Sequence, residues 1–410
     1  MCAEELDVAL IVPNIDAYSG AVERTVKVVE HSRTVGLNYT AFLPAGGAPN
    51  AELARDLERL EREGRLVRRT LRPEDAADGK PSFDAVAIPT EYWWGAWKRA
   101  KAAGIRGPYC VDFHLLPYVG TLDLLKSAGV DNPRLPDLTR LPFLLRRTYM
   151  EGLVASTYQT VACVASVRSL ARVRGGRVLA ISRSVERNLR SLAYGEAVYV
   201  PGRPNGIEPG AVREALKTTE PIRYDGIYVA RFHPQKGLYD LPLLVANLRR
   251  RLGREVTVAV CGGTADEAHW ARVREVAASL GVERNLKLLG RVPKTHLYRA
   301  MRQSKALLYP SYVDGFPITV LESLCLGVPV VGYDTDALAM TWGQERAVFR
   351  APVGDPEALA RLYAELEGDA GLEAARAEAE SRSPRLLETY TWEHVVQDQR
   401  AFFEGTVGEA

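Results

Sequence analysis

Two carboxylates, Asp314 and Glu322, stand with seven residues between them in the stretch SYVDGFPITVLESLCLGVPVV, which runs from Ser311 to Val331. Asp314 lies in a Gly-Phe-Pro loop, and Glu322 falls a turn or so into a helix that the sequence predicts to begin near Ile318. An acid in the first turns of a helix is stabilised by the helix dipole. Carboxylates in these two places can converge on one polyhydroxylated ligand as hydrogen-bond acceptors. A hydrolase acid/base pair and a plain capped helix are the other interpretations.

Two cations, Arg231 and Lys236, lie on a proline-containing loop after a predicted strand, in the run YVARFHPQKG from Tyr228 to Gly237. A guanidinium binds anionic oxygens through paired hydrogen bonds, and an ammonium acts as a point charge. The pair is therefore suited to embrace a diphosphate, although an ordinary solvated loop has the same composition. Two further strand ends, Cys261–Gly263 and Gly290–Val292, either let a base or ribose approach the main chain or are plain turns.

The N-terminal half holds two weaker signals, a glycine turn and a histidine. The turn Ser19–Arg24 (SGAVER) lies between the first predicted strand and an amphipathic helix. Backbone N–H groups at such a turn bind anions, and Gly20 permits close approach. The turn lacks the GxGxxG pattern, so a nicotinamide cofactor is not indicated. His114 follows a predicted strand and can hydrogen-bond a sugar hydroxyl or shuttle a proton; a structural histidine is the alternative.

Short β-branched runs alternate with helical patterns along nearly the whole chain, which predicts parallel α/β sheets. Several of these runs are apolar without alternation, as expected of strands that are covered on both faces. The thirteen predicted strands are Val8–Val12, Tyr39–Leu43, Leu66–Leu71, Ala85–Ile88, Pro108–Phe113, Val178–Ile181, Ala197–Val200, Gly226–Ala230, Val256–Val260, Leu286–Leu289, Ala306–Tyr309, Val328–Val331 and Ala347–Arg350.

Two domains are expected because 410 residues exceed what a single core usually holds. Their seam is predicted in the run PGRPNGIEPG (201–210), which contains three prolines and three glycines. We therefore expect a first domain over 1–205 and a second over 206–385, with a C-terminal helix of about 386–410 that joins the first. Ser383 and Pro384 have the pattern of an N-cap and a first helical residue. A further helix is expected to start at Thr391–Glu393.

The composition describes an ordinary globular protein, with 47% hydrophobic and 25% charged residues. A net charge of +2 argues against a dedicated nucleic-acid binder. The five cysteines are scattered without a CxxC pair, which favours a reducing compartment over a disulfide framework or zinc site. The N-terminus lacks a signal-peptide pattern, and no apolar run approaches the roughly 18 residues of a membrane span. A cytoplasmic protein is the expectation.

One basic segment raises a separate expectation of membrane contact. From Asp131 to Arg177 the chain carries eight arginines against three acids, interleaved with apolar residues. Such an amphipathic surface can rest on anionic lipid at the inner membrane face; a solvated helix face is the alternative. The aromatic cluster of Tyr92, Trp93, Trp94 and Trp97 either lines an acceptor site or simply packs.

In their order and spacing, these motifs resemble a family 4 retaining glycosyltransferase with the GT-B fold. The resemblance runs through most of the chain, from the SGAVER loop and His114 to the Asn-Gly pair at the seam (Asn205–Gly206). The family's Gly-Arg-x4-Lys-Gly is represented by Ala230–Gly237. Its Glu-x7-Glu signature is represented by Asp314 and Glu322, and is followed by LGVPVV. The implied fold is two Rossmann-like domains of parallel sheet that face each other across a cleft.

The resemblance implies a role for each matching residue. Arg231 and Lys236 would neutralise the leaving diphosphate, Glu322 would accept hydrogen bonds from the ribose, and Asp314 would contact the donor sugar. His114 would line the sugar pocket, and main chain near Arg291 and Val292 would meet the base. The implied catalytic residues are His114, Arg231, Lys236 and Asp314. The implied donor-binding residues are Gly20, Arg231, Lys236, Arg291, Val292, Asp314, Gly315, Phe316, Ile318, Thr319 and Glu322.

The implied reaction is transfer of a hexose from a nucleotide-diphosphate sugar to a hydroxyl, with retention at the anomeric carbon. The implied partners are the donor and a saccharide, lipid-linked or small-molecule acceptor; no cofactor or metal is expected. Three departures concern the donor pocket: Asp314 replaces a glutamate, Pro317 removes an N–H where relatives have glycine, and Ala230 replaces a glycine. A GT-B nucleotide-sugar epimerase and a non-catalytic sugar-nucleotide-binding relative are the alternative functions.

Overall fold

The computed structural model describes residues 5–12, 20–43, 51–68, 82–89, 93–113, 177–191, 198–217, 221–263 and 268–407. The chain divides into two compact units, each with its own parallel sheet. The N-terminal unit contains Met1–Leu116, Val161–Ile207 and Thr389–Ala410, and the C-terminal unit contains Pro117–Thr160 and Glu208–Glu388.

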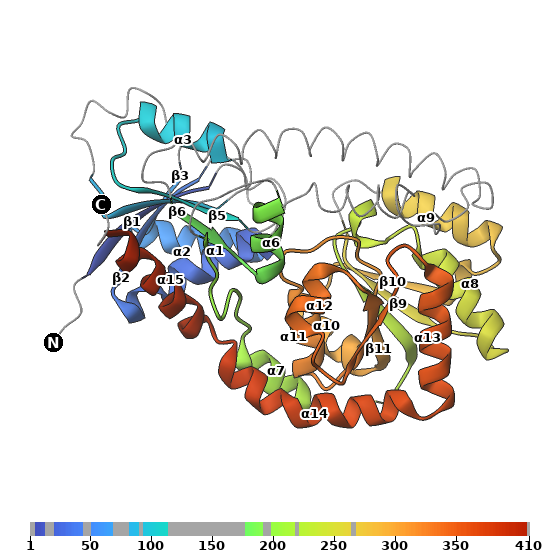
Figure 1. Cartoon of the computed structure of the whole chain (residues 1–410). Helices are drawn as coiled ribbons and strands as arrows, with labels where there is room; N and C mark the ends of the chain where they lie inside the picture. The colour runs from blue at the N-terminus through green and yellow to red at the C-terminus, as the bar shows by residue number, and fades with distance from the viewer. Residues whose placement is uncertain are drawn as a thin grey trace. The chain divides into compact units, whose positions relative to one another are not determined.

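The sheet of the N-terminal unit has seven parallel strands in the order β3-β2-β1-β4-β5-β6-β7. Helices α1, α2 and α15 cover one face, and α3 lies on the other (Figure 1). Because both faces are covered, strands such as β4 are wholly buried and need no polar alternation. The strands are β1 (Leu6–Ile11), β2 (Leu37–Leu43), β3 (Leu66–Arg68), β4 (Ala85–Ile88), β5 (Tyr109–Phe113), β6 (Arg177–Ala180) and β7 (Val198–Tyr199). The helices are α1 (Gly20–His31), η1 (Ser32–Val35), α2 (Ala51–Arg62), α3 (Trp93–Ala102), α6 (Arg183–Ser191) and α15 (Trp392–Val407).

The C-terminal helix α15 supplies a large share of the core of the N-terminal unit. Its buried apolar residues pack with those of β1, β2 and α1, and they are Trp392, Val395, Val396, Phe402 and Phe403. Asp398 on the same helix accepts the backbone N–H of Arg203 at 2.6 Å and forms an ion pair with the Arg203 guanidinium. The end of the chain is therefore fastened to the N-terminal unit by both apolar packing and charge.

The sheet of the C-terminal unit has six parallel strands in the order β10-β9-β8-β11-β12-β13. Figure 1 shows α10, α11 and α12 on one side of this sheet and α8, α9 and α13 on the other. The strands are β8 (Tyr224–Val229), β9 (Val258–Cys261), β10 (Leu286–Gly290), β11 (Ser304–Tyr309), β12 (Val330–Tyr333) and β13 (Val348–Ala351). The helices are α7 (Pro209–Leu216), η4 (Pro234–Lys236), α8 (Leu241–Leu252), α9 (Ala268–Ser279), η5 (Glu283–Asn285), α10 (Lys294–Arg302), α11 (Ile318–Cys325), α12 (Asp336–Trp342), α13 (Pro356–Gly368) and α14 (Gly371–Thr389).

Local sequence explains where several of these helices begin and end. In α13 the Asp355 side chain accepts the N–H of Ala358 at 2.9 Å, and Pro356 follows at the first helical position. Helix α8 has Pro242 in its first turn and ends at Gly253, which takes the left-handed conformation at φ +63°. Residues of α8, α9 and α13 pack with strand residues into one contiguous cluster of buried apolar side chains.

All thirteen predicted strands are present, and the predicted class of two parallel α/β sheets is confirmed. The first strand of the C-terminal unit begins two residues earlier than predicted, and β9 begins two residues later. For Leu66–Leu71 the described part, Leu66–Arg68, is strand β3. The strand predictions succeed because buried β-branched runs flanked by turn residues are the strongest local signal of a parallel sheet.

The prediction that a helix begins at Ser383 and Pro384 is wrong. Both residues lie inside α14, which runs without a break from Gly371 to Thr389. The Ser383 hydroxyl does not cap a helix; it is buried and donates to the carbonyl of Cys325. Proline removes one N–H from a helix interior, but packing of buried residues along α14 outweighs that loss here.

Candidate functional site

The candidate site lies at the carboxyl ends of β8 and β11 in the C-terminal unit. If the strands β8 to β13 of this unit are counted from 1 to 6, their order in the sheet is 3-2-1-4-5-6, which is the order of Rossmann domains. The order reverses between β8 and β11, which pair in parallel with Gly226 beside Ala306 and Ile227 beside Leu307. Ligands of open α/β sheets bind outside the strand ends at this reversal. The loop with Arg231 and Lys236 follows β8, and the loop with Asp314 follows β11.

These two loops are joined by main-chain contacts. The Tyr312 N–H donates to the Gln235 carbonyl at 2.9 Å. Gly237 takes a left-handed φ of +68°, and a Cβ at this position would lie 1.9 Å from the Pro310 carbonyl oxygen. Only glycine fits such a close approach of two backbones. The glycine after Lys236 therefore allows the β8 loop to lie against the β11 loop.

Lys236 and Asp314, predicted as separate ligands of the donor, contact each other. The Lys236 Nζ lies 2.8 Å from Asp314 Oδ2 and donates to the Val313 carbonyl at 3.0 Å. Asp314 Oδ2 also accepts the hydroxyl of Tyr309 and, at 3.3 Å, that of Ser311. Burial, followed by the charge of Asp314, raises the pKa of Tyr309, so its hydroxyl stays a donor. The ammonium is thus fixed at the strand ends, and one oxygen of Asp314 is taken up in fixing it.

Glu322 lies in the middle of α11 and is buried, with 3% of its surface exposed. Its Oε1 accepts the Tyr298 hydroxyl at 3.0 Å and the ammonium of Lys294. Both donors come from α10, four residues apart and therefore on one face of that helix. Sequence reasoning missed Lys294 and Tyr298, as well as the Tyr309 and Ser311 contacts to Asp314. The one available signal was the spacing of a lysine and a tyrosine after the Gly290–Val292 strand end.

The ends of β8, β9 and β10 are linked through their main chains. The Gly262 N–H donates to the Gly290 carbonyl at 2.9 Å, and the Ala230 N–H donates to the Cys261 carbonyl at 3.2 Å. Gly262 has φ +134°, and a Cβ there would lie 1.8 Å from the Ala230 carbonyl oxygen. Arg231 and Arg291 lie on exposed positions of these connected loops. The main chain predicted to meet the base is thereby held beside the Arg231 loop.

The Asp314 loop was predicted to offer backbone N–H groups to the donor, and one of these groups already donates a hydrogen bond within the protein. The Ile318 N–H donates to the Phe316 carbonyl at 2.9 Å, so its predicted role requires this bond to open. Gly315 and Phe316 lie in the loop, and Thr319 lies in the first turn of α11. Pro317 precedes the helix and carries no N–H.

In the N-terminal unit, α1 begins at Gly20, as the strand-to-helix turn predicts, and His114 lies outside the described residues. The Arg24 guanidinium forms a buried ion pair with Asp112 at 3.0 Å, and its Nε donates to the Pro204 carbonyl at 2.9 Å. This arginine therefore ties the first helix to the end of β5 and to the chain before the Asn-Gly pair. Arg24 and both of its partners belong to the N-terminal unit.

His233, which lies between Arg231 and Lys236 in the chain, has a strongly lowered pKa. Burial, then the charges of Arg231, His269 and Lys236, lower the pKa of His233 from 6.5 to about 4. Its Nδ1 accepts the Gln235 N–H at 3.2 Å, which requires an unprotonated nitrogen. The loop that carries both cations is thus braced by a neutral histidine at neutral pH.

We expect His233 to make stability depend on pH. A histidine whose folded pKa lies below its unfolded pKa stabilises the fold above about pH 6.5, and this contribution is lost as the pH falls towards 4. The thermal midpoint of His233→Asn should therefore fall less steeply than that of the wild type between pH 6.5 and 4. If the thermal midpoints of the two proteins fell with the same slope, His233 would not be the source of the pH dependence. Carboxylates that titrate in this range are present in both proteins, so their effect cancels in the comparison.

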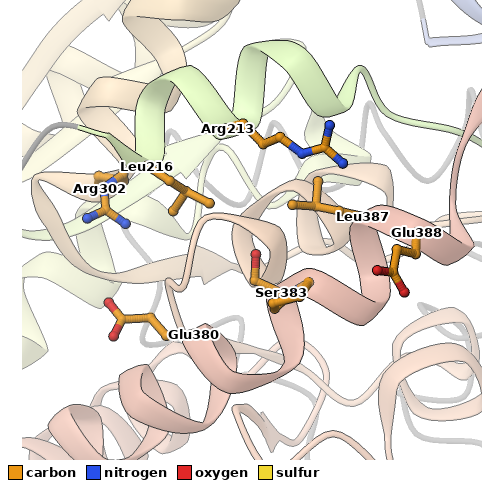
Figure 2. A pocket seen from close by; sticks show the side chains of 8 residues that line it. Arg213, Leu216, Arg302, Glu380, Ser383, Leu387 and Glu388 are labelled. Atoms are coloured by element: carbon orange, nitrogen blue, oxygen red, sulfur yellow. The ribbon is translucent and has the colours of Figure 1, made fainter.

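A cavity of about 510 Å³ lies away from these residues, between α7, α10 and α14. Figure 2 shows Leu216 of α7, Arg302 of α10 and Leu387 of α14 around it. None of the predicted site residues lines this cavity. We locate the candidate site by the sheet reversal and its charged side chains, because cavity size alone carries no chemistry.

Two searches restricted to the described residues are negative. Within these ranges no group of three or more His, Cys, Asp or Glu side chains is arranged to hold a metal ion. In the same part of the chain, no helix has the length and hydropathy needed to cross a membrane.

Comparison with solved structures identifies the fold as GT-B. The sucrose-phosphate synthase of Thermosynechococcus elongatus is similar with a TM-score of 0.67 and 16% identity, covering 99% of this chain and 100% of that chain. HepE of Anabaena, in complex with UDP and glucose, is similar with a TM-score of 0.68 and 13% identity, covering 98% and 100%. At these identities the likeness shows the fold alone.

The sequence comparisons find a family model that matches part of the C-terminal unit. Residues 218–382 match the model Glycosyl transferases group 1. A D-inositol 3-phosphate glycosyltransferase of Salinispora tropica is 29% identical over 187 residues, which are 44% of this chain and 38% of that protein. The amylovoran biosynthesis glycosyltransferase AmsK of Erwinia amylovora is 27% identical over 191 residues, 43% of this chain and 45% of that protein. The matches thus span less than half the length of these curated relatives.

Proposed function

We propose that the protein is a retaining glycosyltransferase that moves a hexose from a nucleotide-diphosphate sugar to an acceptor hydroxyl. One observation carries the proposal: the loops after β8 and β11 bring a lysine and two carboxylates to the sheet reversal of a family-matched domain. A diphosphate needs cations, and a ribose and a hexose need hydrogen-bond acceptors. Both requirements are met by side chains within one unit.

In this proposal each side chain has a defined task at the donor. Lys236, held by Asp314 and Val313, gives a point charge to the diphosphate, and the exposed Arg231 closes on it from the same loop. Glu322 accepts hydrogen bonds from the ribose hydroxyls. The main chain at Arg291 and Val292 meets the base. Gly20 and His114 keep the donor-binding and sugar-binding roles that the resemblance implies for them.

The proposed chemistry needs no covalent nucleophile from the protein. The acceptor oxygen bonds to the anomeric carbon on the face from which the diphosphate leaves, and the electron pair of the broken C–O bond goes to the diphosphate. The acceptor proton passes to that departing oxygen, so atoms and charge balance. The protein's part is to stabilise the developing phosphate charge with groups that are already in place. No metal ion is assigned a role.

The relatives suggest which substrates to test first. Solved neighbours of this fold bind UDP, UDP-glucose or UDP with glucose, so we propose a UDP-sugar donor. The relatives described as D-inositol 3-phosphate glycosyltransferases make that phosphorylated polyol the first acceptor to test. Peripheral contact with an anionic membrane surface stays a separate proposal, since Asp131–Arg177 lies almost wholly outside the described residues. Failure to co-sediment with anionic liposomes at low salt would remove it.

Product analysis tests the proposed reaction. The purified protein is incubated with UDP-, GDP- and ADP-sugars, with and without a panel of acceptors, and nucleoside diphosphate and sugar products are followed by NMR. We expect diphosphate release that depends on the acceptor, and a product with the anomeric configuration of the donor. An inverted product would overturn retention. A new nucleotide sugar formed without acceptor would indicate an epimerase instead.

A further inference from the structure

The carboxylate of Glu322 is held from a neighbouring helix. The hydroxyl of Tyr298 and the ammonium of Lys294 both reach Oε1, and within the described part of the chain both contacts to this carboxylate end on that oxygen. Tyr298 is buried with 1% of its surface exposed, whereas the Lys294 side chain is 39% exposed. The Lys294 Nζ also lies 5.8 Å from the centre of the Tyr298 ring. The three side chains therefore form one unit, which we call the α10 clamp.

The position of the α10 clamp connects it to the ligand. Helix α10 starts at Lys294, two residues after Val292, so the lysine directly follows the strand end proposed for the base. Lys294 contacts Glu322, which we propose binds the ribose. One short helix thus links the two parts of the structure that would hold the nucleoside.

The contacts of the α10 clamp not only stabilise the buried carboxylate of Glu322 but also orient it. A buried carboxylate is costly unless a cation and hydrogen-bond donors compensate it, and Lys294 and Tyr298 supply both. With two donors on Oε1, the orientation of the carboxylate is fixed and Oε2 is the oxygen that faces no donor of the described chain. A vicinal diol presents two O–H donors and binds best to a charged acceptor in a fixed position.

We propose that Lys294 and Tyr298 are positioning residues that make Glu322 selective for the ribose of the nucleotide. This inference rests on the proposed function and deepens it, because it assigns the discrimination between ribose and deoxyribose to the α10 clamp. Lys294 compensates the charge of the carboxylate and orients it, and Tyr298 fixes its rotation. Neither residue needs to touch the ligand.

The test uses isothermal titration calorimetry with UDP, GDP or ADP, whichever binds the wild type most tightly, and with its 2′-deoxy counterpart. We expect the wild type to prefer the ribonucleotide by about 10- to 100-fold, the range of one hydrogen bond to a charged group. In Lys294→Met this preference should shrink to within about threefold, chiefly through weaker ribonucleotide binding. Lys294→Arg should restore it, because the guanidinium keeps the charge.

Two further variants separate positioning from general damage. Tyr298→Phe removes one hydroxyl while keeping the buried ring, and is expected to lower the preference by a smaller factor. Lys287→Met removes an exposed lysine of β10 and should leave the preference at the wild-type value. An unchanged preference in Lys294→Met, including equal weakening of both ligands, overturns the inference while leaving the proposed function intact. Absence of binding of every nucleoside diphosphate to the wild type overturns the proposed function and the inference with it.

Discussion

Lys236→Ala is expected to lower kcat/KM for sugar transfer by about 10³-fold, the upper range for removing one group that stabilises charge in a transition state. The Lys236 side chain is 16% exposed and its ammonium is held by Asp314 and the Val313 carbonyl, so it is in place before the diphosphate arrives. The measurement is steady-state release of nucleoside diphosphate with a verified donor and acceptor pair. The fold should survive, because Tyr309 and Ser311 still donate to Asp314.

The matched control for this substitution is Lys217→Ala. Lys217 is an exposed lysine at the end of α7 whose ion pair with Glu214 contributes little, and its loss should leave turnover within about twofold of the wild type. Turnover of Lys236→Ala at the wild-type rate, with an intact circular dichroism spectrum, would contradict the role of this lysine.

A double-mutant cycle distinguishes two roles for Asp314. If Asp314 acts only by holding Lys236, then Asp314→Asn should cost activity in the wild type but nothing further in Lys236→Ala. If it also contacts the donor sugar, as the resemblance implies, the second substitution should lower kcat/KM again. Because the contacts with Lys236, Tyr309 and Ser311 all end on Oδ2 of Asp314, we propose its other oxygen for the sugar, and the second outcome is our expectation.

Glu322→Gln is expected to weaken nucleotide binding by about 100-fold, as for loss of hydrogen bonds to a charged acceptor. The amide has nearly the same shape, so the core of the C-terminal unit should remain packed. However, it cannot balance the Lys294 ammonium, and it offers a weaker acceptor to the ribose. Calorimetry with the nucleoside diphosphate measures the effect on binding without an acceptor.

Glu373→Gln serves as the control for the Glu322 substitution. Glu373 is an exposed residue in the first turn of α14, so its amide variant should bind nucleotide as the wild type does. A dissociation constant for Glu322→Gln within about twofold of the wild type would remove Glu322 from the donor site.

Much of the fold follows from the sequence because buried parallel strands leave a local pattern. Runs such as Ala85–Ile88 and Val328–Val331 are short, β-branched and bounded by turn residues, and each is found within two residues of the predicted position. The pattern at Ser383 and Pro384 failed for the opposite reason. It is local, whereas this segment is part of α14, where Ser383 is buried and donates to the distant Cys325 carbonyl.

The candidate site was predictable as a set of residues but not as a set of contacts. Arg231, Lys236 and Asp314 lie in loops after strands, and Glu322 lies on the helix that follows, in places that pattern alone identifies. That Lys236 pairs with Asp314, or that Lys294 reaches Glu322, depends on side chains from elements 78 and 28 residues apart in the chain. No periodicity encodes such pairs, and their consequence, a lysine and a glutamate fixed in place, is visible only in three dimensions.

The most direct test of the central claim, that the ends of β8 and β11 bind a nucleotide diphosphate, is a thermal-shift measurement. Wild type, Lys236→Ala and Glu322→Gln are heated with UDP, GDP, ADP and their sugars. A ligand at about 100 times its dissociation constant stabilises the native state by about 2.7 kcal/mol, which raises the midpoint by several degrees. We expect such a shift for at least one nucleotide in the wild type and its loss in both variants. Equal shifts in all three proteins, or no shift in the wild type, would contradict it.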